Sequence, residues 1–267
     1  SMAGVMEGIF WCLDPTLPHN SGAFDRVRIK LREGCIVGIP RFPAATSMAT
    51  TFTADRLANC AIALMAKIDP NKGGAEGGRV GWSCAMFSGE DFRHNNAPYV
   101  DGLIIATTLT GSGPAVKGYD GWVTFGTAAA FGLGWTISAE MWEKAVPHII
   151  ECEEIVPDSL GAGEHCGAPA ARTVVRARVN PFVAAGFFEG KVFPARGVLG
   201  GDGGGPNLGF IVDENGERIQ DLPLIGLFEI KGGQGLECIN SGGGGFGDPL
   251  ERDPERVRQD VRKGWIS

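Results

Sequence analysis

Apolar residues recur at helical spacing in two stretches of the N-terminal part of the chain. Residues 5–10 place apolar side chains on one face of a helix, and residues 54–68 carry a longer face of the same kind. Thr53 precedes the longer stretch, as an N-cap residue does, and Pro70 follows it. These patterns predict two helices, and Ser138 predicts the cap of a further, short one.

Most other apolar residues fall in short runs, several of which alternate with polar residues, as in half-buried strands. Asn215-Gly216, between two such runs, is the strongest hairpin signal in the sequence. We expect strands or strand-rich segments at residues 26–31, 35–39, 81–126, 148–156, 172–179, 182–188, 209–212, 217–219, 227–231 and 236–239. Short helices among many short strands predict an α+β fold that is rich in β structure.

Glycine changes this picture, because the chain contains 42 glycines, about twice the usual share of ~7%. They concentrate in loops, above all Gly200–Gly205 and Gly242–Gly247. Such loops can cradle an anion with backbone amides, or can let two backbones pack closely. Neither ends in the Gly-Lys-Ser/Thr of a P-loop, and Asp248 and Glu251 would repel a phosphate. We therefore expect close backbone packing at an interface.

The end of the chain predicts a capped helix. Asp253 is an N-cap residue, and Pro254 occupies the first helical position, where its missing N–H costs nothing. Val257 and Val261 share one face, and Gly264 predicts the end of the helix.

Charge and cysteine content narrow the function classes. The net charge of −7 argues against nucleic acid and against an anionic membrane surface as partners. The seven cysteines include no C-x-x-C pair, and no apolar run is long enough to span a membrane, so we expect reduced thiols in a cytoplasmic protein. The 267 residues are expected to form a single unit, with a possible weak seam near residues 71–78.

Three carboxylates are the candidates for chemistry. Glu140 and Glu143 lie three residues apart on a predicted helical turn, so both can point the same way. Asp120 lies in a predicted turn between Tyr119 and Trp122. A buried carboxylate can act as a general base, whereas the alternative for the glutamates is an exposed helical face. The histidines show no metal-ligand spacing.

Several motifs resemble the C-terminal half of the hydantoinase B/oxoprolinase family. They are LDPTLPHNSGAF with RVRIKLREGC, VPDSLGAGEHCG, RGVLGGDGGGPN, and GGGGFGDPLERDPERVRQDV at the end of the chain. Glu164 and Cys166 stand where the family pattern tends to carry arginines. The resemblance extends over essentially the whole chain.

The resemblance implies one part of a multi-subunit, ATP-dependent hydrolase of cyclic amides. It implies a hydantoinase A-like subunit that binds ATP, a chain resembling the N-terminal half of hydantoinase B, and a small-molecule substrate. A divalent metal such as Zn or Mn is implied in that N-terminal half or in a partner, so no metal ligand and no cofactor-binding residue is assigned to this chain.

Two alternatives remain open. The segment SAEMWEKAVP resembles the large subunits of acetone carboxylases, which implies a subunit of an ATP-dependent ketone carboxylase. The third hypothesis is a non-catalytic scaffold that holds a catalytic chain through its glycine loops.

Overall fold

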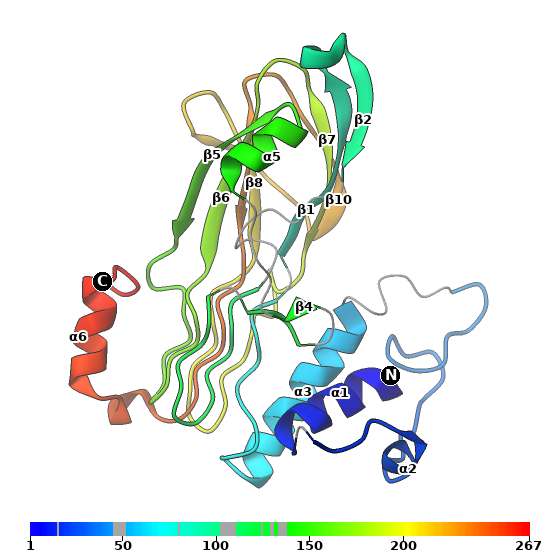
Figure 1. Cartoon of the computed structure of the whole chain (residues 1–267), viewed down its shortest axis with the longest axis vertical. Coiled ribbons are helices and arrows are strands. Elements are labelled where there is room, and N and C mark those ends of the chain that lie inside the picture. The colour runs from blue at the N-terminus through cyan, green and yellow to red at the C-terminus, as the bar shows by residue number, and fades with distance from the viewer. Residues whose placement is uncertain are drawn as a thin grey trace.

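The computed structural model describes residues 1–14, 16–44, 52–79, 81–101, 111–123, 125–128, 131–132 and 138–267, of which 81–85, 101, 127, 131 and 132 are described by their backbone alone. Its α-helices are α1 (Met2–Cys12), α2 (Ser21–Phe24), α3 (Ala54–Ile68), α5 (Ala139–Ala145) and α6 (Pro254–Arg262). They surround antiparallel sheets, which confirms the predicted α+β class (Figure 1). Within this described part, no helix has the length and apolar character needed to cross a membrane.

Two antiparallel sheets form the β-rich part of the molecule (Figure 1). The four-stranded sheet has the order β10 (Ile225–Ile230), β7 (Phe182–Phe188), β1 (Gly81–Asp91) and β2 (Ala97–Asp101). The five-stranded sheet has the order β5 (His148–Ile155), β6 (Ala171–Ala177), β11 (Gly235–Ile239), β8 (Leu208–Val212) and β9 (Arg218–Asp221). A short pair, β3 (Gly126–Thr127) and β4 (Phe131–Gly132), stands apart.

One hydrophobic core joins the two sheets. Phe87 and Phe182 of the four-stranded sheet belong to the same buried cluster as Val175 and Leu236 of the five-stranded sheet. Trp142 of α5 is fully buried in this cluster and lies edge-on to Phe87, at 5.4 Å between ring centroids. The alternation of large apolar and smaller or polar residues along each strand turns these side chains to one side.

The opposite side of the five-stranded sheet carries a set of ion pairs, which we call the charged sheet face. Glu237 is only 1% exposed and lies between Arg172, at 2.6 Å, and Arg218, at 2.7 Å. Arg176 pairs with Glu151, its Nε lying 2.8 Å from Oε2. The charged residues of neighbouring strands therefore neutralise one another across this face.

Helices α1 and α3 pack very closely. A Cβ atom on Gly4 would lie 2.5 Å from the carbonyl oxygen of Ala54, and one on Gly8 would lie 2.3 Å from that of Ala58. Glycine and alanine at the crossing therefore let the two backbones touch. Figure 1 shows the pair at the end of the molecule away from α5.

The glycine loops form a layer of extended segments that run side by side between α6 and the α1–α3 pair (Figure 1). We call this the glycine layer; its segments are residues 73–79, 111–121, 159–168, 195–205 and 241–247. Every backbone N–H from Gly242 to Gly247 donates to a carbonyl of another segment. A Cβ on Gly243 would lie 1.9 Å from the carbonyl oxygen of Gly113. The structure confirms the close backbone packing, but places it within the chain and not at an interface. Because every N–H of Gly242–Gly247 is already hydrogen-bonded, these residues cannot cradle a phosphate.

Three strand predictions were wrong. Residues 26–31 and 35–39 form turns and irregular structure, with an isolated bridge between Glu33 and Ile39. No described element covers the apolar side chains of this segment, since Ile36 is 92% exposed, and two short runs alone do not make a stable sheet. Residues 118–123 cross the glycine layer, where Gly121 donates to Cys166, instead of forming a strand. The predicted run at 103–110 lies outside the described residues.

The remaining helix and strand predictions agree with the structure, but Thr53 has helical dihedral angles and makes no capping hydrogen bond, so that cap prediction was wrong. The helix at residues 54–68, the Ser138 cap and the helix capped by Asp253 are all present. The Asn215-Gly216 turn joins β8 to β9, with Gly216 at φ 83°, as the hairpin signal requires. The segment near 71–78 enters the glycine layer, and the single-unit and seam predictions stay predictions.

Candidate active site

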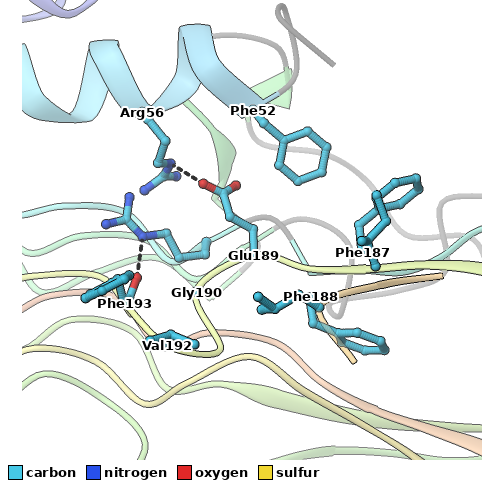
Figure 2. A pocket seen from close by; sticks show the side chains of 11 residues that line it. Phe52, Arg56, Phe187, Phe188, Glu189, Gly190, Val192 and Phe193 are labelled. Atoms are coloured by element: carbon cyan, nitrogen blue, oxygen red, sulfur yellow. Dashed lines mark hydrogen bonds and ion pairs between the residues drawn. The ribbon is translucent and has the colours of Figure 1, made fainter. Parts of the chain in front are cut away.

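A pocket of about 540 Å³ lies where β7 ends beside α3 (Figure 2). Its walls are mostly apolar, and Phe52 and Phe187 approach with 6.0 Å between ring centroids. The apolar lining is Phe52, Phe187, Phe188, Val192, Phe193, Leu224 and Ile225. The charged side chains that line it are Arg56, Arg79 and Glu189. An apolar cavity with a few convergent polar groups is the usual form of a small-molecule site.

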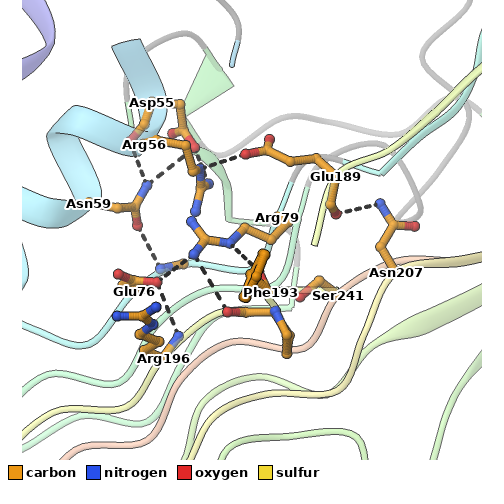
Figure 3. A network of polar contacts seen from close by, with 12 residues as sticks. Asp55, Arg56, Asn59, Glu76, Arg79, Glu189, Phe193, Arg196, Asn207 and Ser241 are labelled. Carbon is orange, nitrogen blue, oxygen red and sulfur yellow. Dashed lines mark hydrogen bonds and ion pairs between the residues drawn. The ribbon is translucent and has the colours of Figure 1, made fainter. Parts of the chain in front are cut away.

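Arg56 and Glu189 form an ion pair at this pocket. Arg56 belongs to α3, and Glu189 follows the last residue of β7; Nε and Oε1 are 3.1 Å apart. Arg56 also contacts Asp55, so its guanidinium lies between two carboxylates (Figure 3). Helix α3 and strand β7 therefore bring together residues that are far apart in the sequence.

A hydrogen-bond network supports the Arg56–Glu189 pair on the side of the glycine layer (Figure 3). Arg79 donates to Glu76 at 2.7 Å and, through Nε, to the carbonyl of Phe193 at 3.2 Å. Asn59 donates to the carbonyl of Asp55 at 2.9 Å and accepts the N–H of Gly77 at 2.7 Å. Buried polar groups that are hydrogen-bonded to one another fix the position of the groups they carry. The network therefore fastens α3 to the glycine layer beneath the pocket.

Burial raises the pKa of Glu189 to about 7, with Asp55 and Glu76 adding to the rise and Arg56 opposing it. Near neutral pH this carboxyl is therefore divided between its charged and neutral forms. A group in that condition can both accept and donate a proton, which is what general acid–base catalysis requires.

The pair also has unused hydrogen-bonding capacity. Among the residues that the structure describes, Glu189 Oε2 and Arg56 Nη1 are buried without a hydrogen-bond partner. One is an acceptor when ionised and the other a donor. Buried polar atoms are normally paired, so an unpaired acceptor and donor beside a pocket favour a ligand that presents both complements.

The sequence candidate Asp120 lies elsewhere, between the glycine layer and α6. Its Oδ1 accepts from Arg252 and from the N–H of Cys166, both at 2.8 Å. Burial alone would raise the pKa of Asp120, but hydrogen bonds from Arg252 and Cys166 outweigh it and hold the pKa below its usual value. Arg252 also donates to Asp260 at 2.6 Å, which ties α6 to the layer.

Glu140 and Glu143 lie on α5, at the other end of the molecule from α6 (Figure 1). Glu140 is exposed, and hydrogen bonds from its own N–H and from the Ser138 hydroxyl lower its pKa. The carboxylate of Glu143 accepts the N–H of Ile150 at 3.0 Å, which joins α5 to β5. The structure does not bring these two glutamates together with Asp120.

Sequence reasoning missed Arg56 and Glu189. Glu189 lies between Phe188 and Gly190, and a charged residue directly after an apolar strand was the available signal. Gly190 has φ 87°, and a Cβ there would lie 2.2 Å from Cγ of Arg79. Glycine thus lets the arginine pass against the turn that carries Glu189.

The described residues do not fit the metal that the family resemblance implies. No three His, Cys, Asp or Glu side chains among them converge as ligands for a metal ion.

The chain is similar to known proteins over most or all of its length. The sequence model of the hydantoinase B/oxoprolinase family matches residues 1–249. Caprolactamase subunit beta of Pseudomonas jessenii is 29% identical over 270 residues, which cover 100% of this chain and 46% of that protein.

Two solved structures match the fold of nearly the whole chain. The crystal structure of ATP-dependent caprolactamase from Pseudomonas jessenii matches with a TM-score of 0.81 and 28% identity, over 99% of this chain and 45% of that chain. Nucleotide-free acetone carboxylase matches with a TM-score of 0.72 over 98% of this chain and 38% of that chain; at 17% identity it shows a shared fold alone. The chain spans less than half the length of these proteins.

Proposed function

We propose, since the chain belongs to the hydantoinase B/oxoprolinase family, that it supplies part of the B-type subunit of an ATP-dependent cyclic-amide hydrolase. We further propose that the pocket at Arg56 and Glu189 binds the cyclic amide. The observation that carries this proposal is the unpaired donor and acceptor of that ion pair at an apolar pocket.

The shape of a small cyclic amide supports this assignment. Ring closure holds the amide in the cis form, so its C=O and N–H lie on the same side of the ring. Arg56 can donate to the oxygen while ionised Glu189 accepts from the nitrogen. The methylene groups of the ring then lie against the phenylalanines, where their burial is favourable at about 0.8 kcal/mol per CH₂.

Glu189 supplies proton transfer in this proposal. Hydrolysis breaks the ring C–N bond, adds the hydroxyl of water to the carbonyl carbon and delivers a proton to the nitrogen. With a pKa of about 7, Glu189 can take the proton from water and return it to the leaving nitrogen.

The partners follow from the family. ATP, bound on a hydantoinase A-like subunit, supplies the phosphoryl group that activates the amide oxygen. Cleavage of the ring C–N bond then leaves an acyl phosphate, and a second water molecule releases its phosphoryl group as inorganic phosphate. The rest of the B-type subunit, resembling the N-terminal half of hydantoinase B, carries the divalent metal. The cysteines that the structure describes as free fit a reducing, cytoplasmic location.

The test is Glu189→Gln in the assembled complex, with amide hydrolysis measured from pH 5 to 9. Glu217→Gln, an exposed glutamate of the β8–β9 turn, is the matched control. We expect E189Q to lower kcat by about 10²–10⁴ and to remove the limb of the pH profile near 7, because the base is gone. Wild-type activity with an unchanged pH profile in E189Q would refute the role of Glu189.

Asp120, Glu140 and Glu143 remain a second proposal for the catalytic carboxylates. Asp120→Asn, Glu140→Gln and Glu143→Gln are measured in the same assay together with their unfolding midpoints. A catalytic role requires a lower kcat at an unchanged midpoint. A lower midpoint in D120N or E143Q would instead assign these residues to their contacts with Arg252 and Ile150.

Ketone carboxylation is the alternative activity, because the segment SAEMWEKAVP resembles the large subunits of acetone carboxylases. ATP turnover of the complex with cyclic amides, against acetone or acetophenone plus bicarbonate, separates the two. Ketone-dependent bicarbonate fixation without amide hydrolysis would replace our proposal. A scaffold role would be adopted if no carboxylate variant changed activity while the complex failed to assemble without this chain.

A further inference from the structure

The outer side of the four-stranded sheet is apolar and exposed; we call it the apolar sheet face. It is formed by the side chains that alternate with the core residues, and its exposed members are Met86 (53%), Val100 (73%), Ile225 (64%) and Leu227 (75%). Strand register places Met86 and Leu227 on either side of Ala185, and pairs Ile225 with Phe187. Met86, Leu227 and Ile225 therefore belong to one continuous surface across β1, β7 and β10, and Val100, opposite Ser88, extends it onto β2.

The outer side of the other sheet differs. The charged sheet face belongs to a sheet of the same fold, yet Glu237 and its two arginines cover it with ion pairs. A contiguous apolar surface on a soluble protein usually marks an interaction site. An edge strand such as β10 that carries Ile225 and Leu227 outward also invites association, because natural edges are usually charged.

The apolar sheet face runs into the candidate active site. Ile225 and Phe187 belong to both, since they line the pocket at the end of β7. A protein segment that covered this face would therefore also border the pocket mouth. It would shield the Arg56–Glu189 pair from bulk solvent, which strengthens the electrostatic interactions inside the site.

The length of caprolactamase subunit beta indicates which protein segment covers the apolar sheet face. This chain accounts for 46% of caprolactamase subunit beta, so more than half of that subunit lies outside the matched part. We propose that the apolar sheet face docks the part of the B-type subunit that lies outside this match, whether it is joined to this chain or carried on a second polypeptide. The inference rests on the proposed B-type role. The occupant presents apolar side chains to Met86 and Leu227, and a basic group to Glu229, which is exposed on the same side.

The test compares the full chain alone with the complete B-type subunit by carbene footprinting of solvent-accessible side chains. We expect labelling of Met86 and Leu227 to fall by about fivefold in the complete subunit, as for side chains that enter an interface core. Ile219, a 53% exposed apolar residue of β9 in the other sheet, is the matched control and keeps its labelling.

A pair of variants completes the test. Leu227→Asp in the complete subunit is expected to restore labelling at Met86, whereas Ile219→Asp does not. Unchanged labelling of the face in the complete subunit would overturn the proposal. So would protection that already appears in the chain alone and grows with its concentration, because the occupant would then be a second copy. The readout needs no catalysis, so failure of the proposed activity leaves this result independent.

Discussion

The two sheets bury their inner sides in one core, but the outer side of one carries ion pairs and the outer side of the other carries exposed apolar side chains. On the charged sheet face, Glu237 is buried between Arg172 and Arg218, and the guanidinium of Arg218 lies 4.0 Å from the ring centre of Phe210. On the apolar sheet face, Leu227 and Val100 are about three quarters exposed. The first face is complete within the chain, whereas the second has the composition of a surface that another protein covers.

Stability and assembly therefore depend on different faces of the two sheets. The ion pairs of the charged sheet face contribute to the folding of this chain, because their removal leaves buried polar groups without partners. The side chains of the apolar sheet face contribute little to that folding, since they contact water in the isolated chain.

The largest effect is expected for Glu237→Gln. It removes the charge that two arginines neutralise, and should lower the free energy of unfolding by about 2–3 kcal/mol, because the arginines are only partly buried and can turn to water. Denaturant unfolding measures this, with Glu217→Gln, in the turn between β8 and β9 of the same sheet, as the exposed control. Equal stability of the two variants would show that the charged sheet face is not a source of stability.

Lowering the pH should reduce the stability that the charged sheet face contributes. Burial alone would raise the pKa of Glu237, but hydrogen bonds from Arg218 and Arg172 outweigh it and hold the pKa below its usual value. Its stabilising contribution is therefore complete above the ordinary pKa of a glutamate, about 4.3, and is lost as the pH falls through the lowered folded value. The unfolding free energy of the wild type should consequently fall more steeply with acid than that of E237Q. Parallel curves would contradict this assignment.

A smaller effect is expected for Glu151→Gln. Its carboxylate pairs with Arg176 at 2.8 Å but is 45% exposed, so the pair is screened by water. The expected loss is about 0.5 kcal/mol, and it should shrink further in 1 M salt. A loss as large as that of E237Q would mean that exposure does not decide the value of these pairs.

The smallest effect on folding is expected for Leu227→Asp. Since Leu227 is 75% exposed, its replacement should change the unfolding free energy by no more than about 0.5 kcal/mol. Denaturant unfolding of the chain alone measures this. A large loss would show that Leu227 is needed for the fold, and would weaken its assignment to an assembly surface.

Much of the fold could be predicted from local pattern. The helix at residues 54–68 and the strand at 182–188 were found because their apolar spacing is regular and their ends carry clear signals. The segments 26–31 and 35–39 have the same alternation but lack neighbours to pair with, so the pattern alone misled. Pairing partners are set by the whole fold.

The candidate site was much less predictable. Asp120 and Glu143 were selected for local context, and each makes contacts that only the fold reveals, to Arg252 and to the N–H of Ile150. Arg56 and Glu189 are 133 positions apart and show no joint motif. Their pairing and the raised pKa of Glu189 depend on burial beside Asp55 and Glu76.

By itself, the sequence determined the family, the α+β class, most element positions and the close packing of the glycine loops, because each follows from local composition and spacing. The tertiary structure alone decided which carboxylate is buried beside an arginine at a pocket, and which sheet face is charged or apolar. The physical reason is that burial and pairing depend on neighbours distant in sequence.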